Sequence, residues 1–446
     1  MNTAETLRQR IESDQAVVGI IGLGYVGLPL AHAFHEGGLK ILGFDIDQSK
    51  IDALKVGRNY LKHLGGEMTT ALSKSSRFSA TTDFKRLAEC DAIIICVPTP
   101  LGKHQEPDIS YIVNSAHDIG RTLRRGQLIC LESTTYPGTT RDDMVPAMLE
   151  AMPAGSPKLV SGTDYFVAFS PEREDPGRKT HNTKTTPKLV GGLDAVSSEL
   201  ASLLYKKGVQ NVVTVSSAEV AEAAKVLENT FRAVNIALVN ELKLILTPMG
   251  IDVWEVIEAA ATKPFGFMPF YPGPGLGGHC IPIDPFYLTW KAKEVGKSTH
   301  FIELAGQINT SMPHYVVDRM VAALNQDSKP MRGSKVLVCG LAYKPNIDDT
   351  RETPAAEIIE LLADLGAQVS YHDPHVPNFP PMRKHKIEMK SVDLTPAVVK
   401  GFDCVVIVTD HAAVDYKVIA DSAKLVVDTR NALKGMHNRG ARVVKA

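Results

Sequence analysis

The residues best suited to covalent chemistry lie around Cys280, in a Gly- and Pro-rich stretch at 264–285 that we expect to form a loop. The thiol stands in GLGGHCIPID, and Asp284 follows it four residues later. A thiol is a good nucleophile, and neighbouring glycines leave room for a substrate to approach closely. We interpret Cys280 as a candidate nucleophile and Asp284 as a candidate partner. A packing role for Cys280 is the alternative.

The other cysteines have a different setting, inside or beside apolar runs that look like buried strands. They are Cys90, Cys96, Cys130, Cys339 and Cys404. Cysteine in such runs is usually a small hydrophobic residue. The chain has no CxxC pair, which argues against a zinc ribbon or a thioredoxin-type site. We therefore expect no metal.

A second candidate site is the glycine pattern Gly22-x-Gly24-x-x-Gly27. It directly follows the predicted strand Val17–Ile21 and opens a predicted helix, and Asp45 comes 23 residues after Gly22. This context is typical of a dinucleotide site, in which the helix N-terminus faces the pyrophosphate and the acidic residue binds the adenosine ribose. Because the carboxylate would repel a 2′-phosphate, we expect NAD rather than NADP. A glycine turn without a ligand is the alternative.

Polar residues also follow several predicted strands, at the sheet edge where ligands of parallel sheets bind. Thr134 lies in LESTTYPGTT, and Thr139 in the same segment is expected to cap the following helix. Glu172 lies in SPERE, as a base or as the ion-pair partner of Arg173, and VPTP (97–100) ends another strand.

A helix of about 33 residues is predicted from Ser217 to Met249, because apolar residues recur there at helical spacing. Lys225 and Asn229 are four residues apart and share a face of it. A solvated charged face is the usual reading of such residues. Small and apolar neighbours instead favour a partly buried Lys225 that donates a charge-assisted hydrogen bond to an anionic intermediate.

Apolar strands alternate with helices at both ends of the chain. The N-terminal strands are predicted at 17–21, 40–45, 92–98, 127–133, 166–172 and 211–215. This alternation predicts an α/β fold with two Rossmann-like, doubly wound parallel-sheet domains joined by a long central helix and a helical dimerisation region. We expect a NAD-binding domain at 1–212, a central helical domain with the cysteine loop at 213–326, and a third domain at 327–446.

The C-terminal α/β domain has GLAYKP (340–345) where the first domain has its glycine pattern. It lacks the three glycines, so no second NAD is expected there. Lys344 and Arg351 supply donors for another phosphorylated ligand.

Composition narrows the class of protein. The 446 residues are 44% hydrophobic and 22% charged, with a formal net charge of −1. This balance argues against a nucleic-acid-wrapping or membrane-gripping protein. No apolar run approaches the roughly 20 residues of a membrane span, and no secretory signal is visible. We therefore expect a cytoplasmic protein.

Seven segments occur in an order that resembles the UDP-glucose/GDP-mannose dehydrogenase family. They are GLGYVGLP, CVPTP, ESTTYPGTT, SPERE, AEAAKVLENTFRAVNIALVNE, PGPGLGGHCIPIDP and GLAYKPNIDDTRETPA. The match covers nearly the whole chain and is similar above all to bacterial UDP-N-acetylglucosamine 6-dehydrogenases. The resemblance implies four-electron oxidation of UDP-N-acetyl-D-glucosamine at C6 to UDP-N-acetyl-D-glucosaminuronate with two NAD+, for surface polysaccharide synthesis.

The resemblance also assigns roles. Cys280 matches the nucleophile that forms a thiohemiacetal and then a thioester. Lys225 and Asn229 match oxyanion-stabilising residues, and Asp284 matches a carboxylate linked to general base work. Thr134 and Glu172 match residues tied to the water and to thioester hydrolysis. The implied cofactor-binding residues are Gly22, Gly24, Tyr25, Val26, Gly27, Asp45, Pro98, Thr99, Thr134, Lys344 and Arg351. The implied substrate-binding residues are Glu172, Arg173, Lys225, Asn229, Arg232, Gly277 and Arg430.

One position departs from the family. UDP-glucose dehydrogenases have a second glutamate four residues after the position of Glu172, and this chain has Pro176 there. Its role is either absent or supplied elsewhere, for example by Glu174. The family also implies a homodimer or higher homo-oligomer with the long helix at its core, and active-site contributions of Lys344 and Arg351 from a neighbouring subunit.

Three alternatives remain open. UDP-N-acetylgalactosamine differs from the preferred substrate only at C4. A two-electron NAD-dependent hydroxyacid dehydrogenase would share the Rossmann domain and the long helix, but would need neither Cys280 nor a second α/β domain. A non-catalytic NAD-sensing protein would bind nucleotide without turnover.

Overall fold

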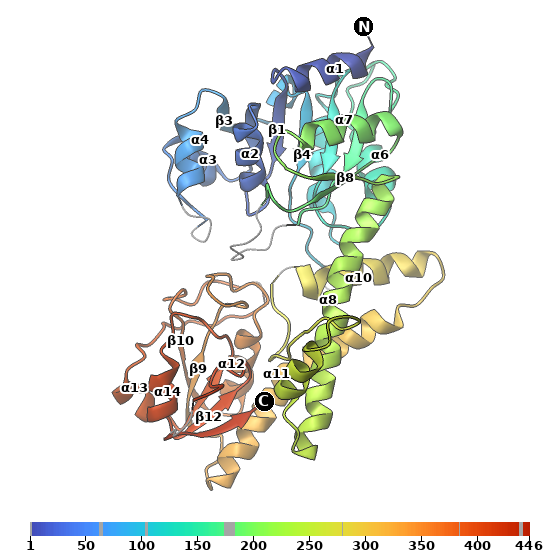
Figure 1. Ribbon diagram of the computed structural model, residues 1–446. Helices are drawn as coiled ribbons and strands as arrows, with labels where there is room; N and C mark the ends of the chain where they lie inside the picture. Colours follow the sequence, from blue (N-terminus) through green and yellow to red (C-terminus); the bar gives the residue numbers. More distant parts are fainter. Residues whose placement is uncertain are drawn as a thin grey trace. The chain divides into compact units, whose positions relative to one another are not determined.

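The computed structural model describes residues 2–61, 66–102, 106–173, 183–278, 280–382, 384–436 and 440–446. It divides into two compact units. The first comprises Met1–Glu228 with Phe286–Lys297, and the second comprises Asn229–Pro285 with Ser298–Ala446. Figure 1 shows the chain coloured along the sequence.

The first unit is built on a sheet of eight described strands in the order β3-β2-β1-β4-β5-β6-β7-β8. Their bounds are β1 Val17–Ile21, β2 Lys40–Phe44, β3 Phe78–Thr81, β4 Ala92–Ile95, β5 Leu128–Leu131, β6 Phe166–Phe169, β7 Lys188–Gly192 and β8 Val212–Thr214. All neighbours pair in parallel except β6 and β7, which are antiparallel. Residues of β4, β5 and β6 are fully buried, as expected for strands covered on both faces.

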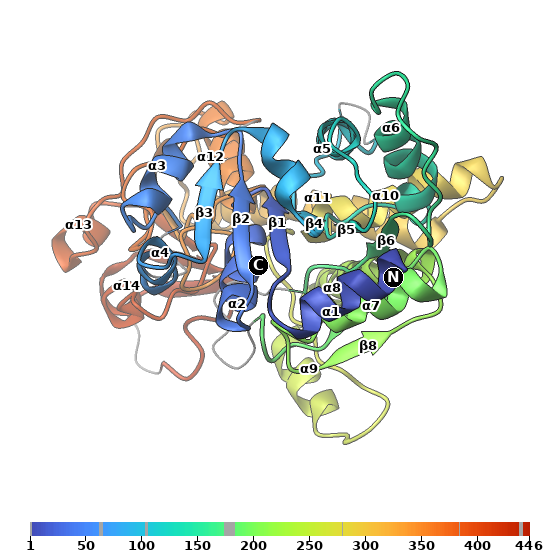
Figure 2. The ribbon, with the colours of Figure 1, turned by 90° about the horizontal axis from the view of Figure 1, so that it is seen from above.

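Helices lie on both faces of this sheet, as the view from above shows (Figure 2). They are α1 Thr3–Glu12, α2 Gly27–Glu36, α3 Gln48–Lys55, α4 Glu67–Ser73, α5 Ser110–Gly120, α6 Val145–Glu150 and α7 Ala195–Tyr205. A 3₁₀ turn, η2 (Phe84–Glu89), and a π-helical turn, η3 (Thr140–Met144), complete the set. The predicted α/β class is confirmed. Strands β3 and β7 were not predicted. The residues of β3 are half-buried or exposed, and its sequence accordingly lacks the apolar run that marks a buried strand.

Helix α8 (Ala218–Leu246) has 29 residues, or about 44 Å at 1.5 Å per residue. Its residues up to Glu228 belong to the first unit, and those from Asn229 belong to the second. The predicted helix to Met249 is shortened because Thr247–Met249 tightens into a 3₁₀ turn that ends at Gly250, with φ +74°. None of the described helices is both long enough and apolar enough to cross a membrane.

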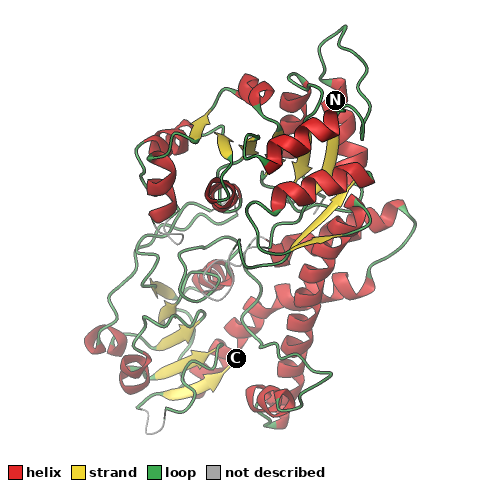
Figure 3. Cartoon of the chain, turned by 45° about the horizontal axis from the view of Figure 1, so that its top comes forward, coloured by secondary structure: helices red, strands yellow, loops and turns green. Residues whose placement is uncertain are grey.

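The second unit has a five-stranded parallel sheet, among its described residues, in the order β10-β9-β11-β12-β13. The strands are β9 Lys335–Cys339, β10 Gln368–His372, β11 Cys404–Ile407, β12 Leu425–Asp428 and β13 Arg442–Lys445. The helices are α9 Val253–Ala261, α11 His300–Gln326, α12 Pro354–Asp364, α13 Pro396–Lys400 and α14 Tyr416–Ser422. Figure 3 separates helices, strands and loops by colour.

Helix α10 (Cys280–Glu294) corrects one prediction. The Gly- and Pro-rich segment was expected to remain a loop through residue 285, but the helix begins at Cys280. Pro282 is tolerated because proline is accepted in the first turn of a helix, where backbone amides have no intrahelical partner.

Candidate active site

The glycine turn after β1 has the geometry that a bound dinucleotide needs. Gly22 has φ +91°, and a Cβ there would lie 2.4 Å from the Cys96 carbonyl oxygen. A Cβ on Gly27 would lie 1.8 Å from the Gly22 carbonyl oxygen, whereas a Cβ on Gly24 would meet nothing within 4 Å. Gly22 and Gly27 thus close the turn, and Gly24 faces open space. No side chain caps the N-terminus of α2, at Val26, which leaves its amides for an anion.

Asp45 lies directly after β2, where it fixes the same turn. Its Oδ2 accepts hydrogen bonds from the Leu23 amide and from Lys50 Nζ, both at 2.9 Å, and its Oδ1 accepts one from the Asp47 amide at 3.0 Å. Oδ1 therefore keeps a lone pair for a ribose hydroxyl. These residues fit NAD. The sequence did not single out Lys50, because a lysine on an exposed helix is usually solvated.

In the segment after β5, the hydroxyl of Thr134 differs from those of its neighbours in its hydrogen bonding. Ser133 bonds the Val97 carbonyl at 2.7 Å, and Thr135 bonds Thr139 at 2.6 Å. Thr134 between them is half-buried, and its hydroxyl makes no hydrogen bond with the described residues. The Thr134 hydroxyl is therefore not occupied by another described residue, and its role in holding a water stays a prediction.

The predicted cap at Thr139 is wrong. Its hydroxyl bonds the Tyr136 carbonyl at 2.9 Å, and the helical turn that follows has no local side-chain cap. Glu222 of α8 takes this place. It is fully buried and accepts hydrogen bonds from the Gly138 amide at 2.6 Å and the Thr140 amide at 3.0 Å. Burial raises the pKa of Glu222 to about 7.

Lys225 is buried, as its small and apolar neighbours predicted, with 4% of its surface exposed. Its Nζ donates to the Glu172 carbonyl at 2.5 Å and lies 3.3 Å from Glu172 Oε2. Of the two readings of Glu172, a base or the ion-pair partner of Arg173, the structure does not favour the second, because it pairs Glu172 with Lys225 and Arg173 with Glu228. Helix α8 thus organises the end of β6 through two ion pairs.

A cavity of about 20 Å³ lies at this edge of the first sheet. It is lined by Val26, Leu30, Glu132, Glu172, Arg173, Thr183, Thr186 and Lys188. Lys188 Nζ and Glu132 Oε2 are 2.8 Å apart, with side chains that are 7% and 1% exposed. Sequence reasoning missed this buried ion pair, because the two residues are separated by 56 positions and neither belongs to an obvious pattern.

Other predicted cofactor residues of the first unit lie near the ends of its strands. Thr99 is buried and its carbonyl accepts a hydrogen bond from Tyr287, while Pro98 and Tyr25 are exposed. Glu174 and Pro176 lie outside the described residues, so the structure does not bear on the missing second glutamate.

In the second unit, Cys280 begins α10 and is half-buried. Asp284 lies one helical turn along the same helix, so the two side chains share a face. Asn229 Nδ2 donates to Asp284 Oδ2 at 2.5 Å, and Arg232 donates to Asn229 Oδ1. Since the first turn of a helix favours negative charge, this position suits a reactive thiolate. Burial raises the pKa of the Cys130 and Cys339 thiols to about 12, which makes these two cysteines poor nucleophiles.

The loop before Cys280 packs on the segment that follows β9. A Cβ on Gly277 would lie 2.4 Å from Tyr343 Cβ, and the Gly278 amide donates to the Arg351 carbonyl at 2.8 Å. The guanidinium of Arg351 pairs with Asp349 at 2.6 Å. Lys344 is half-buried in the same segment. Gly277 therefore has no space for a side chain.

Arg430 follows β12 and reaches the Gly273 backbone. Its Nε donates to the Val408 carbonyl at 2.8 Å, and a Cβ on Gly273 would lie 2.6 Å from its Nη1. Lys243 donates to the Gly273 carbonyl at 3.3 Å. Burial, and secondarily Arg430, lowers the pKa of Lys243 to about 7. Lys243 was not predicted, because only the fold brings α8, this loop and β12 together.

The turn after β9 repeats the first turn with one decisive change. Gly340 has φ +91°, and Asp373 accepts from the Leu341 and Ala342 amides at 2.6 and 3.0 Å, as Asp45 does from Leu23. Here His411 Nε2 lies 3.0 Å from the same carboxylate oxygen of Asp373. Burial raises the pKa of Asp373, but His411 and the backbone amides of Ala342 and Leu341 together outweigh burial and lower the pKa to about 2.

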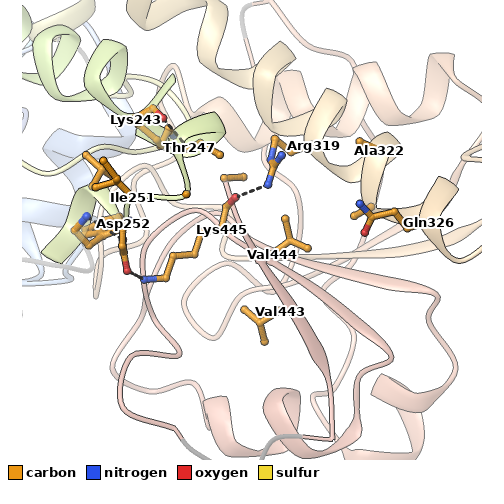
Figure 4. A pocket seen from close by; sticks show the side chains of 15 residues that line it. Lys243, Thr247, Ile251, Asp252, Arg319, Ala322, Gln326, Val443, Val444 and Lys445 are labelled. Atoms are coloured by element: carbon orange, nitrogen blue, oxygen red, sulfur yellow. Dashed lines mark hydrogen bonds and ion pairs between the residues drawn. The ribbon is translucent and has the colours of Figure 1, made fainter. Parts of the chain in front are cut away.

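A larger cavity, of about 410 Å³, lies in the second unit (Figure 4). Helix α8 and the turn after it line it together with α11 and β13, through residues such as Lys243, Asp252, Arg319 and Lys445. None of the residues predicted from sequence lines it. Among the described residues, no group of three or more His, Cys, Asp or Glu side chains is placed to hold a metal ion.

Three family models match the chain in the order of its domains. They are the NAD binding domain of the UDP-glucose/GDP-mannose dehydrogenase family at residues 16–209, its central domain at 219–311 and its UDP binding domain at 337–435. The chain belongs to the UDP-glucose/GDP-mannose dehydrogenase family. The dehydrogenase is therefore an NAD-dependent oxidoreductase with a nucleotide-sugar substrate.

Relatives of this dehydrogenase carry different sugar names. The UDP-N-acetyl-D-glucosamine 6-dehydrogenase of Pseudomonas aeruginosa is 40% identical over 80% of this chain and 83% of its own. The structure of a UDP-D-ManNAc dehydrogenase from Pyrococcus horikoshii has a TM-score of 0.84 at 32% identity and covers 96% of this chain and 99% of its own. An NDP-N-acetyl-D-galactosaminuronic acid dehydrogenase from Methanosarcina mazei Go1 has a TM-score of 0.80 at 31% identity, covering 100% and 98%.

Proposed function

We propose that the dehydrogenase oxidises C6 of UDP-N-acetyl-D-glucosamine to the carboxylate through a thioester on Cys280. The observation that carries this proposal is the placement of Cys280 at the N-terminus of α10, one turn before Asp284. The 40% identity to a UDP-N-acetyl-D-glucosamine 6-dehydrogenase supports the choice of sugar.

NAD+ supplies the hydride acceptor for both oxidations when it is bound. Asp284 is the proposed base for the C6 hydroxyl proton. The Cys280 thiolate then forms a C–S bond with the aldehyde carbon, and the former aldehyde oxygen takes back the proton from Asp284 to become the thiohemiacetal hydroxyl. In the second oxidation C6 loses its remaining hydride to the acceptor and the hydroxyl loses its proton to Asp284, which leaves the thioester. Lys225 and Asn229, four residues apart on α8, donate hydrogen bonds to the oxygen anion. Covalent capture divides the reaction into easier steps and retains the aldehyde.

Hydrolysis completes the proposed reaction. Water held by Thr134 adds to the thioester carbonyl, a C–O bond forms, and the C–S bond breaks. Sulfur leaves as thiolate and the product as carboxylate, so two protons are released, and they pass to solvent through Glu172. Glu172 suits this role because its Oε2 lies 3.3 Å from Lys225 Nζ, next to the proposed oxyanion donor.

The proposed NAD-binding residues are Gly22, Gly24, Tyr25, Val26, Gly27, Asp45, Pro98, Thr99, Thr134, Lys344 and Arg351. The proposed substrate-binding residues are Glu172, Arg173, Lys225, Asn229, Arg232, Gly277 and Arg430. We place NAD binding at 1–212, the central region at 213–326 and UDP-sugar binding at 327–446. A cytoplasmic role in surface polysaccharide synthesis follows from the proposed product.

A homodimer is proposed from the exposed face of α8. Phe231, Leu238 and Ile245 recur every seven residues and are 45%, 50% and 49% exposed. Apolar side chains exposed at this regular spacing along a helix are typical of a surface that packs on another helix.

The deciding measurement is the number of NADH molecules formed per sugar consumed, with UDP-GlcNAc, UDP-GalNAc, UDP-ManNAc and UDP-glucose in parallel. We expect about two with UDP-GlcNAc. UDP-GalNAc is the second candidate, because the Methanosarcina mazei relative is named for galactosaminuronic acid. A ratio of about one would contradict the thioester and favour a two-electron dehydrogenase.

Cys280→Ala and Cys280→Ser test the nucleophile directly. Both variants should lose formation of the acid, since no thioester can form, while NADH and UDP still bind. The measurement is product analysis by mass spectrometry, with Cys339→Ser as the matched thiol control. Turnover at the wild-type rate in either Cys280 variant would remove Cys280 from the mechanism.

A further inference from the structure

The geometry points to Glu222 as a positioning residue, whose buried carboxylate holds the Thr134 segment against α8. This inference rests on the proposed function, because it concerns the water that Thr134 is proposed to hold. Glu222 has no role in the proposed chemistry, and the sequence presented it only as one of several charges on a long helix.

Glu222 is fully buried, and each carboxylate oxygen has a short hydrogen bond. Oε2 accepts from the Gly138 amide at 2.6 Å. Oε1 accepts from the Thr140 amide at 3.0 Å and from Thr140 Oγ1 at 2.6 Å. Hydrogen bonds to a buried carboxylate are among the strong ones. Glu222 therefore connects two segments more than eighty positions apart.

These contacts make Glu222 the N-terminal cap of the helical stretch that η3 and α6 form. Amides in the first turn of a helix have no intrahelical acceptor, and the residue in the cap position, Thr139, does not supply one. A carboxylate at that end also interacts favourably with the helix dipole. A distant part of the chain thus provides the cap that local sequence lacks.

The anchored turn is continuous with the proposed water site. Thr134 precedes Gly138 by four residues, and the Thr135–Thr139 bond of 2.6 Å spans the same stretch. A shift at Gly138 is therefore passed to Thr134. On the helix, Glu222 precedes Lys225 by three residues, so both project from the same side, and Lys225 holds Glu172. Glu222 sets Thr134 relative to the Lys225–Glu172 pair.

Several charged side chains surround the contact between Glu222 and the Gly138–Thr140 turn. Glu219 and Arg141 form an ion pair at 2.6 Å. A Cβ on Gly138 would lie 2.8 Å from Asp142 Oδ2 and 3.9 Å from Lys291 Cε. Glu219 stands one turn before Glu222 on α8, with a side chain 32% exposed. It offers a matched control, because the same substitution there alters the contacts with Arg141 and Ser217 but leaves the hydrogen bonds to the Gly138 and Thr140 amides in place.

Glu222→Gln tests the inference. The amide nitrogen would face the N–H of either Gly138 or Thr140, so the turn must move. A misplacement of about 1 Å lowers a rate about 10²-fold, and we expect a loss of kcat between about tenfold and that value. KM for UDP-GlcNAc and the Kd for NADH should stay within about threefold. Glu219→Gln should behave as wild type.

The step that slows identifies positioning as distinct from a loss of stability. Glu222→Gln should form NADH in a burst of about two per site and accumulate the Cys280 thioester, seen by mass spectrometry of the quenched protein. Thr140→Val removes one donor and keeps the fold, so it should show a smaller effect of the same kind. It also keeps the inference testable if Glu222→Gln does not fold.

Three results would overturn the inference: unchanged kcat, a loss of kcat without thioester accumulation, or a loss that only follows the folded fraction. Thr134→Val separates this failure from failure of the proposed function. If Thr134→Val accumulates thioester and the Glu222 and Thr140 variants do not, only the role of Glu222 is wrong. If wild type forms about one NADH per sugar, the proposed function itself fails.

Discussion

Among the described residues of this dehydrogenase, three lysine side chains are buried, which is unusual for a charged residue. Lys225, Lys188 and Lys243 are 4%, 6% and 3% exposed. Two of them have carboxylate partners, Glu172 and Glu132. Lys243 instead contacts the Gly273 carbonyl and lies 5.2 Å from the Tyr315 ring centroid. Burying an ammonium group without a carboxylate partner costs free energy. Burial therefore favours the neutral amine and lowers the pKa of Lys243 to about 7.

Lys243 should therefore leave a mark on stability against pH. Between pH 7 and the usual lysine pKa of 10.5, the unfolded chain binds a proton that the folded chain does not. The free energy of unfolding should rise with pH there, by about 1.4 kcal/mol per unit from this group. Lys243→Met should abolish that rise, as measured by urea unfolding at pH 7.5 to 10.

The exposed Lys417 provides the control for this measurement. It is 76% exposed in its side chain and pairs with Asp421 on the surface, so Lys417→Met should leave the slope unchanged. An unaltered slope in Lys243→Met would show that the folded-state pKa of Lys243 is close to that of a solvated lysine.

In the turn between β1 and α2, Gly24 and Gly27 are glycine for different physical reasons. Gly27 is required by packing, since its Cβ would lie 1.8 Å from the Gly22 carbonyl oxygen. Gly24 has no such constraint, because nothing lies within 4 Å of its Cβ position. We infer that Gly24 keeps space for the cofactor, whereas Gly27 keeps the helix against the strand.

A pair of alanine variants separates these two reasons. Gly27→Ala should lower both the melting temperature and the affinity for NADH, because α2 must move away from β1. Gly24→Ala should keep the melting temperature within a few degrees and still lose NADH affinity by at least about tenfold. Thermal melts and fluorescence titration with NADH measure the two effects. Tight NADH binding by Gly24→Ala would place the pyrophosphate elsewhere.

Assembly is a property of the whole molecule that rests on the outer face of α8. The described residues of this helix leave Phe231, Leu238 and Ile245 exposed at a spacing of seven. Exposed leucines and phenylalanines occur singly on most proteins, but a regular stripe is typical of a helix that packs on another helix. The proposed homodimer would bury this stripe.

A charge placed in the stripe tests the dimer. Leu238→Glu should shift the protein from dimer to monomer in light scattering after gel filtration, since burying an unpaired carboxylate is strongly unfavourable. Leu365→Glu is the matched control, because Leu365 is similarly exposed at 42% but lies after α12. A Leu238→Glu protein that stays dimeric would move the interface away from this face.

Periodicity and glycine spacing were sufficient to predict the α/β class, the glycine turn after β1 and the long helix. These features depend on contacts between near neighbours in sequence, so local pattern carries them. The resemblance of seven motifs also predicted the family correctly. The half-buried strand β3 and the antiparallel β7 escaped, because their residues lack the apolar runs of central strands.

Hydrogen-bond and ion-pair partners that are far apart in sequence could be identified only from the tertiary structure. Glu222 rather than Thr139 caps the turn after β5, Lys225 rather than Arg173 holds Glu172, and His411 occupies Asp373 in the second glycine turn. Each of these pairings depends on which polar groups the fold buries next to one another. A buried group takes the strongest partner that tertiary packing brings within hydrogen-bond distance, and sequence spacing carries no information about that choice.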